Sequence, residues 1–176
     1  MSQLVTLINP HNAQTGESLE IMAWPIGTRR PPVPPEVPCS IREDYDEAAR
    51  VLPYSAKASA ALSRRCLQHV LKDAGKTKAD WLAEQIEEVR QNLPDEIAGN
   101  LDYVRVIGKF AAHPEKSKAT GEIVDIEPGE AEWNLDILDS LFDRYYARPA
   151  RDKRMRDEFD KRLMGMGKQP VSKKNQ

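Results

Sequence analysis

Apolar residues recur at helical spacing through most of the chain after residue 40. The clearest row has four-residue intervals and comprises Ala58, Leu62, Cys66 and Val70. Because an α-helix has about 3.6 residues per turn, such a row stays on one face and can be buried. The pattern predicts about five helices, in the segments 41–52, 56–74, 79–91, 95–113 and 131–148.

Residues that start and stop helices separate these segments. Ser40 and Ser55 are suited to cap the first two helices, because a serine hydroxyl accepts a hydrogen bond from the backbone at a helix N-terminus. Gly75 suits the C′ position after the second helix, and Pro149 is expected to end the last strong helix. Residues 41–148 are therefore predicted to form an all-α bundle with short connections.

The first 40 residues follow a different pattern. Two short apolar runs, residues 3–8 and 19–24, flank a turn-rich segment and predict a β-hairpin. Residues 25–38 then contain six prolines in fourteen positions, which predicts an extended arm. This arm either lies as a strap across the helical body or binds a partner through its PxxP-like spacing. Residues 1–40 are thus expected to hold the hairpin and the proline-rich arm.

The C-terminal residues 149–176 form a basic tail. Residues 148–176 contain ten Lys or Arg against four Asp or Glu, a net charge of +6, so the remainder carries -8 of the total of -2. An amphipathic helix is possible over residues 151–167, and the last nine residues are expected to be disordered. The tail either contacts nucleic acid or an acidic partner, or only solubilises the terminus. The basic residues proposed for nucleic-acid contact there are Arg151, Lys153, Arg154 and Arg156.

Composition excludes several classes of protein. The chain has 176 residues, of which 40% are hydrophobic and 31% charged, which fits one compact domain with appendages. No apolar run is long enough to span a bilayer, and the N-terminus lacks the pattern of a secretory signal. Cys39 and Cys66 are isolated, so no disulfide framework, metal site or cofactor is predicted. Reduced thiols favour a cytoplasmic protein.

The segment LDYVRVIGKFAAHP, residues 101–114, holds the candidate chemistry. Read as a helix, it places Arg105, Lys109 and His113 on one polar stripe, because successive i+4 positions drift by only about 40°. The opposite side carries apolar residues that can face a core, namely Val104, Ile107, Phe110 and Ala111. His113 is catalytic, binds a phosphate or caps the carbonyls at its helix end. The sequence leaves these three roles open.

A second group of charged residues lies in the most apolar of the predicted helices. Arg64 or Arg65 is expected to pair with a carboxylate of the preceding helix, one of Asp44, Asp46 and Glu47. The alternative is that the two arginines extend the basic stripe across a neighbouring helix. His69 is expected to be a satisfied histidine on the helix surface. Cys66 and the tryptophans Trp24, Trp81 and Trp133 are expected to pack in the core or, for the tryptophans, against the arm.

Three blocks of the sequence resemble a known family. In order along the chain they are DYDEAARVLPYSAKASAALSRRCLQHVL, LDYVRVIGKFAAHP and EPGEAEWNLDILDSLFDRYY. Over about residues 37–149 they are similar to the bacterial domain of unknown function numbered 4145. The resemblance implies the HEPN-like superfamily of helical bundles. Some members of that superfamily dimerise and cleave RNA without a metal ion, and others are inactive binding or scaffold modules.

The chain departs from the superfamily at the position that matters most for catalysis. Active members have an arginine five positions before the histidine, whereas Gly108 stands five positions before His113. We therefore expect a non-catalytic interaction or scaffold module, associated with nucleic-acid enzymes or with bacterial or phage defence. The alternative is a metal-independent endoribonuclease that uses His113 with Lys109 or Arg105. The resemblance also implies a homodimer, with residues 101–113 as the favoured interface. Contact with nucleic acid is expected to be weak, and contact with a membrane is not expected.

Overall fold

The computed structural model describes residues 3–7, 19–23, 30–113 and 125–171. The chain divides into two units, Met1–Pro31 and Pro32–Gln176. In the first unit, strand β1 (Gln3–Leu7) pairs antiparallel with strand β2 (Leu19–Ala23), with Val5 opposite Ile21. The predicted turn between them, the first part of the proline-rich arm and Trp24 lie outside the described residues.

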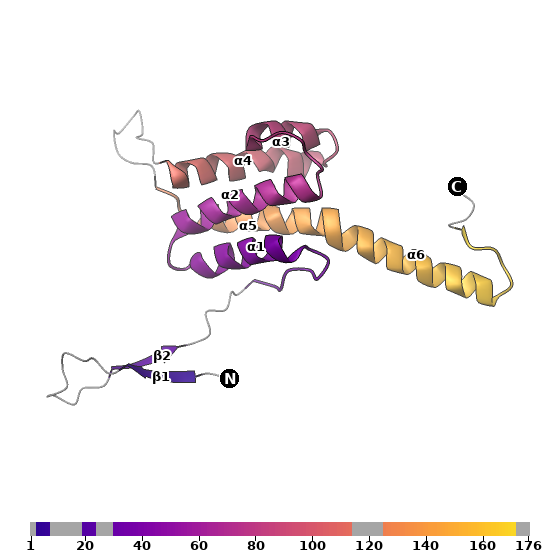
Figure 1. The fold of residues 1–176 in the computed structure, drawn as a ribbon, viewed down its shortest axis with the longest axis horizontal. Helices are drawn as coiled ribbons and strands as arrows, with labels where there is room; N and C mark the ends of the chain where they lie inside the picture. Colours follow the sequence, from indigo (N-terminus) through magenta and orange to yellow (C-terminus); the bar gives the residue numbers. More distant parts are fainter. Residues whose placement is uncertain (1–2, 8–18, 24–29, 114–124, 172–176) are drawn as a thin grey trace. The chain divides into compact units, whose positions relative to one another are not determined.

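The second unit is helical. Its elements in chain order are α1 (Cys39–Val51), α2 (Ala56–Asp73), α3 (Leu82–Arg90), α4 (Asp95–Ala112), α5 (Pro128–Phe142), the π-helical turn η1 (Asp143–Ala147) and α6 (Arg148–Gly165). Helix α2 lies in the middle of the bundle and packs against α1, α4 and α5 (Figure 1). Helices α1 to α5 correspond to the five predicted segments, so the prediction of a helical bundle is confirmed. No helix in the described part of the chain is both long and apolar enough to cross a membrane.

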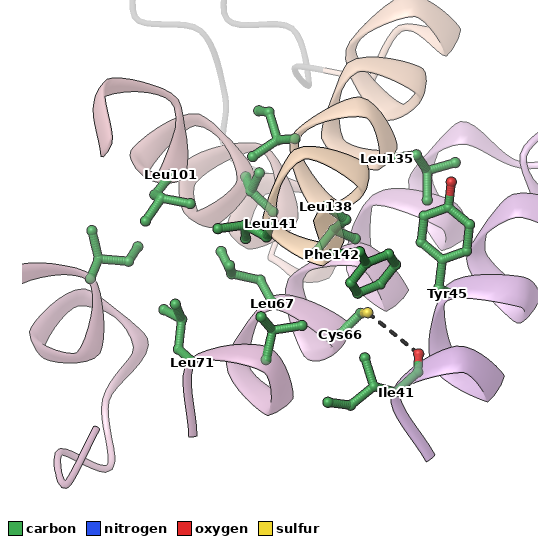
Figure 2. Close-up of a cluster of buried hydrophobic side chains, with 14 of the residues drawn as sticks. Ile41, Tyr45, Cys66, Leu67, Leu71, Leu101, Leu135, Leu138, Leu141 and Phe142 are labelled. Atoms are coloured by element: carbon green, nitrogen blue, oxygen red, sulfur yellow. Dashed lines mark hydrogen bonds between the residues drawn. The ribbon is translucent and has the colours of Figure 1, made fainter. Parts of the chain in front are cut away.

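The core forms where the apolar faces of four helices meet. Tyr45 of α1, Leu67 of α2, Leu101 of α4 and Leu138 of α5 are all completely buried. Figure 2 shows these side chains converging, with the ring of Phe142 beside Tyr45 at a centroid distance of 5.2 Å. Burying each of these large side chains contributes about 1.5–3 kcal/mol by the hydrophobic effect.

The segment before α1 also packs on this core. Val37 is 1% exposed and Val33 is partly buried against the same cluster. The last residues of the predicted arm therefore lie on the bundle. Packing of the rest of the arm, before residue 30, stays a prediction.

Two of the predicted helix ends differ from the structure. Ser55 caps α2 as predicted, since its Oγ accepts a hydrogen bond from the Ala58 N–H at 3.1 Å. Ser40 does not cap α1, because the helix begins one residue earlier, at Cys39, after the fixed backbone of Pro38. After α2, the left-handed conformation belongs to Lys76 (φ 54°) and not to Gly75. A Cβ at Gly75 would lie 2.6 Å from the Leu71 carbonyl oxygen, so close packing explains this glycine.

Pro149 does not end the last bundle helix, contrary to the prediction. The chain runs from α5 through η1 directly into α6, and Pro149 lies in the first turn of α6. A proline ring clashes with the carbonyl four residues earlier in a regular α-helix. The wider π-helical turn at Asp143–Ala147 precedes the proline and lets the helix continue past it.

Other predictions from the apolar pattern have mixed outcomes. Trp81 is 74% exposed, so its assignment to the core is wrong. Trp133 is partly buried and its ring lies 4.9 Å from that of Tyr103. Cys66 is buried as predicted, with its Sγ 3.6 Å from the Ile41 carbonyl oxygen that accepts its hydrogen bond (Figure 2). Burial raises the pKa of the Cys66 thiol well above its usual range, which makes it unreactive.

Candidate functional site

The predicted polar stripe lies on the C-terminal half of α4. Its apolar counterpart faces the core, since Val104, Ile107 and Ala111 are buried, although Phe110 is only half-buried. Lys109 and His113 are exposed, and Arg105 has an exposed side-chain fraction of 31%. The helical spacing thus brings the three residues onto one face, as predicted.

Arg105 is held by a network of ion pairs that begins on α3. Its Nε lies 2.9 Å from Asp102 Oδ1, and Asp102 Oδ2 lies 2.7 Å from Arg90 Nη2. Arg90 also contacts Glu87 at 2.8 Å. The hydrogen bond from Arg90, followed by that from Arg105, holds the pKa of Asp102 below its usual value. One carboxylate is therefore shared by two guanidinium groups, and Arg105 already has an anionic partner.

Arg64 of α2 reaches the same part of α4. Its Nη1 donates a hydrogen bond to the Arg105 carbonyl at 2.7 Å. Burial, followed by repulsion from the Arg105 charge, lowers the pKa of Arg64. Arg64 thus places a further cation beside Arg105 on α4.

Gly108 lies at a tight contact between α4 and α2. A Cβ at this position would lie 2.5 Å from Arg64 Cβ and 3.1 Å from the Ala60 carbonyl oxygen. Both of these atoms are attached to the backbone of α2, so a side chain at position 108 requires the two helices to separate. An arginine five positions before His113 is incompatible with this packing.

His113 occupies the end of α4. It is the C-cap residue, with φ -132° and ψ 88°, and its backbone N–H donates to the Lys109 carbonyl at 2.8 Å. Its side chain is exposed. The positive charge of a protonated imidazole is favoured at this end of a helix. The residues that follow, 114–124, lie outside the described residues.

The predicted ion pair between α2 and α1 is present and has a third member. Arg65 Nη2 lies 2.6 Å from Asp44 Oδ1 and 3.1 Å from Glu47 Oε2, which confirms the prediction for Arg65. His69 Nδ1 lies 2.6 Å from Asp44 Oδ2, so the same carboxylate lies beside both Arg65 and His69. The sequence did not lead us to place His69 beside that carboxylate. The i, i+4 spacing of the two residues on α2 is the signal that could have indicated it.

Arg64 precedes His69 by five positions on α2. Five residues turn an α-helix by about 140°, which directs the two side chains to different neighbours. Arg64 contacts α4, whereas His69 contacts Asp44 of α1. The two residues of one chain therefore do not converge on one site.

A cleft of about 470 Å³ lies at the opposite end of α4 from His113. It is formed by the first turns of α4, the end of α5, η1 and the start of α6. Its lining comprises Pro94, Glu96, Ile97, Asn100, Ile137, Ser140, Asp143, Arg144 and Arg148. Two arginines and two acidic residues line it together, so its charge is balanced. Since none of the candidate residues predicted for catalysis lines this cleft, it does not enclose the stripe.

The basic residues predicted in the C-terminal tail lie on α6. Arg154 contacts Glu36 at 2.8 Å and, through that hydrogen bond above all, lowers the pKa of Glu36. Arg151 lies 3.5 Å from Asp143, and Arg156 Nε donates to the Asp152 carbonyl at 3.1 Å. Lys153 is exposed. These cations form a band around the first half of α6, partly neutralised by acidic neighbours.

Helix α6 is unusual in how little of it is covered. Among the described helices of the second unit it contacts η1 alone, and it extends away from the other helices of that unit (Figure 1). Its apolar residues Met155, Phe159, Met164 and Met166 are each more than half exposed. The amphipathic helix predicted over residues 151–167 of the basic tail corresponds to α6. Its sparse apolar positions were the signal for a surface that is not part of the core.

The described residues contain no group of three or more side chains suited to hold a metal ion. The candidate site is therefore a set of cations and one histidine on α4 and α2, together with the exposed helix α6. Such a set can attract an anion, and the exposed apolar residues can bind a protein surface.

Comparison with known proteins identifies the family. The profile of a family described as Domain of unknown function (DUF4145) matches residues 46–158, which is more than half of the chain and runs from α1 into α6. No curated protein and no solved structure matches the sequence. The extent of the family match agrees with the resemblance seen over about residues 37–149. This chain belongs to the DUF4145 family.

Proposed function

We propose that this protein is a non-catalytic interaction module of the HEPN-like type that works beside nucleic-acid enzymes or in bacterial or phage defence. The observation that carries this proposal is the packing at Gly108. The position at which an active nuclease of that type has its arginine is filled by the body of Arg64 on the neighbouring helix. The glycine allows α2 and α4 to pack tightly there, and an arginine at the same position would prevent that packing.

The charges around His113 support the same conclusion. A ribonuclease needs a base for the 2′-hydroxyl and a cation that stabilises the charge on phosphorus. Arg105 is eight residues before His113, or about 12 Å along a helix, and its guanidinium is bound by Asp102. Lys109 is one turn from His113, a distance at which a lysine and a histidine can act on the same phosphate. This pair is the specific observation in favour of the alternative, a metal-independent endoribonuclease.

Contact with nucleic acid, in this proposal, is electrostatic and weak. The cations of α6 and of the stripe attract phosphates, whereas the body of the protein is acidic and opposes them. Affinity should fall linearly with the logarithm of salt concentration, with a slope of about -0.9 for each duplex-DNA phosphate neutralised. Removal of residues 150–176 should flatten that slope, and His113→Ala should leave it nearly unchanged.

The two functions are separated by an RNA cleavage assay in EDTA. We expect no cleavage of single-stranded or structured RNA by the wild type beyond that seen with His113→Ala. Cleavage that is lost in His113→Ala and in Lys109→Ala, and retained in Lys78→Ala as a lysine control outside the stripe, would replace our proposal with the endoribonuclease. Circular dichroism of each variant checks that the bundle is intact.

The interaction function is tested by recovery of partners from the host. The wild type should retain a defined protein, and Phe159→Asp should lose it, because Phe159 is exposed on α6 and supports no part of the core. Met164→Asp changes a similarly exposed side chain on the opposite side of α6 and serves as the control. Equal recovery by all three proteins would mean that α6 is not the binding surface.

A further inference from the structure

Two apolar residues of α6 and a third at its C-cap lie along one side of the helix. We define the α6 stripe as Met155, Phe159 and Met166, whose exposed fractions are 63%, 54% and 58%. With Asp152 and Arg162 they follow the intervals 3, 4, 3 and 4, which is the spacing of core positions in a coiled coil. Such spacing keeps all five residues on the side that faces a partner helix.

The described residues of the second unit leave this side of α6 open. After α6, Gly167 adopts φ 73°, and the Lys168 N–H donates to the Leu163 carbonyl at 2.9 Å, so the chain reverses direction. The Val171 N–H then donates to Asp160 Oδ1 at 2.8 Å. Asp160 is about 100° around the helix from Phe159, so this return segment covers a different side of α6.

An uncovered helix of this kind would gain stability from a partner. Isolated helices shorter than about 12–15 residues are marginal in water, and most helical stability in proteins comes from packing of an apolar face. Helix α6 has 18 residues, and apart from its junction with η1 no other described helix of the second unit packs against it. A second helix laid along the α6 stripe would supply the missing contacts.

We propose that the α6 stripe pairs in antiparallel orientation with the α6 stripe of a second copy of this chain. The proposal names a partner for the interaction function above and rests on that function only in part, since self-association can be measured without any other protein. The antiparallel register is centred on Asp157, so that a residue a given number of positions before Asp157 faces the residue the same number of positions after Asp157 in the second copy. Met155 then packs on Phe159 of the second copy, and Asp152 meets its Arg162.

Charge complementarity selects the second copy and the antiparallel direction. Within α6, residues 148–156 carry five basic residues and one acidic residue, whereas residues 157–165 carry three acidic and two basic residues. Antiparallel pairing places the strongly basic half against the acidic half and opposes the two helix dipoles favourably. Parallel pairing would place Asp152 on Asp152 and Arg162 on Arg162, which is unfavourable at core positions. Only two apolar layers form, so we expect a weak dimer.

The first test measures the mass of the full chain by light scattering over a series of concentrations. The expected result is a rise from 19.9 kDa toward twice that mass. Met155→Asp should weaken the association by roughly tenfold or more, since it buries an unpaired charge. Met164→Asp should leave it unchanged, because Met164 is similarly exposed but about 180° away from Met155. A mass of 19.9 kDa at all concentrations overturns the proposal.

The second test fixes the direction and register. Asp152→Arg and Arg162→Asp should each weaken the dimer, and the double variant should restore it, because each reversed residue again meets an opposite charge. In a Cys39→Ser background, Met155→Cys and Phe159→Cys should form a disulfide with each other when mixed, and each should form little with itself. Asp157→Cys, which points away from the partner, is the control. Self-linking of Met155→Cys at the level of the mixture would show a parallel dimer and overturn the proposal.

These outcomes separate self-association from the broader function. Loss of a host partner in Phe159→Asp without any dimer of the wild type would keep the interaction function and reject the second copy. A wild type that stays monomeric but whose RNA binding is lost in Met155→Asp would assign the α6 stripe to nucleic acid. Neither result changes the interpretation of the polar stripe on α4.

Discussion

Helices α5 and α6 are two halves of one continuous helical rod, but the apolar residues of α5 are buried and those of α6 are largely exposed. Leu135, Leu138 and Leu141 of α5 are completely buried, whereas Met155 and Phe159 of α6 are more than half exposed. The helical backbone passes from one half to the other through the π-helical turn η1 without a break. What differs is the neighbours, because α5 lies among α1, α2 and α4 and α6 extends beyond them. The contribution of an apolar side chain to stability is therefore set by the contacts of its helix and not by its helical spacing alone.

The largest change in the free energy of unfolding is expected when a core side chain is removed, and this change tests the comparison between α5 and α6. Leu138→Ala should reduce the free energy of unfolding by about 2–5 kcal/mol, because it leaves a cavity among four helices. Met155→Ala removes a similar number of atoms from α6 and should change it by less than about 0.5 kcal/mol. Urea unfolding followed by circular dichroism, at a protein concentration where the chain is monomeric, measures both. Equal losses for the two variants would show that α6 is covered in the monomer.

A smaller effect is expected at the α2–α4 contact. Gly108→Ala should destabilise the bundle by about 1–3 kcal/mol, because its Cβ would meet Arg64 Cβ at 2.5 Å. Gly99→Ala lies in the same helix with no atom within 4 Å of the added Cβ, and should stabilise the protein by about 0.5–1 kcal/mol. The sign of the effect therefore differs between two glycines of α4. Urea unfolding measures the change in the free energy of unfolding for both variants. A stabilising effect of Gly108→Ala would remove the main support for the non-catalytic proposal.

The ends of the bundle helices offer a test of intermediate size. Ser55→Ala should cost about 0.5–2 kcal/mol, because it removes the hydrogen bond that caps the Ala58 N–H. Ser40→Ala should change the free energy of unfolding by less than about 0.5 kcal/mol, since Ser40 is exposed and α1 begins at Cys39. Thermal unfolding of the two variants side by side provides the measurement. A large loss for Ser40→Ala would indicate that the hydroxyl does cap α1 in solution.

These helix ends also show how far the sequence could be interpreted by itself. The helical spacing was sufficient for α1 to α5, because each buries a continuous apolar face and the positions of that face repeat. Ser55 was identified as a cap by its place before an apolar row, but the same rule was wrong for Ser40, because α1 already begins at Cys39 with Pro38 as its N-cap. Pro149 was misjudged because a π-helical turn accommodates a proline that a regular helix does not. The local sequence therefore predicts that a helix exists, but it predicts where the helix begins or ends only where no neighbouring residue has a stronger effect on the backbone conformation.

The candidate site was predictable only in part, for a related reason. The spacing of Arg105, Lys109 and His113 places them on one face of any helix, so the stripe followed from the sequence. The position of Arg64 over Gly108 depends on how closely α2 and α4 approach, and nothing in the local sequence specifies that distance. Sharing of Asp102 between Arg90 and Arg105 likewise joins α3 to α4 across a turn. Tertiary contacts of this kind decide which cations of a stripe are available.

The smallest effect concerns that shared carboxylate and depends on pH. The pKa of Asp102 is lower in the folded protein than its usual value, chiefly through the hydrogen bond from Arg90. The unfolded chain therefore binds the proton more tightly, and the stabilisation is present above the usual pKa and lost as pH falls through the lowered one. Because the side chain of Asp102 is 40% exposed, Asp102→Asn should cost no more than about 1 kcal/mol at neutral pH.

The difference between Asp102→Asn and the wild type should shrink as the pH falls below about 4, the usual range for an aspartate. Asp157→Asn is the control, because Asp157 is exposed on α6 and belongs to the half of the rod without bundle contacts. Its free energy of unfolding should follow that of the wild type at every pH. Urea unfolding at several pH values measures all three proteins. A loss of unfolding free energy for Asp102→Asn that persists at low pH would assign the effect to hydrogen bonding or packing and not to charge. An equal pH dependence for Asp157→Asn would show that the bundle and α6 do not differ in their electrostatics.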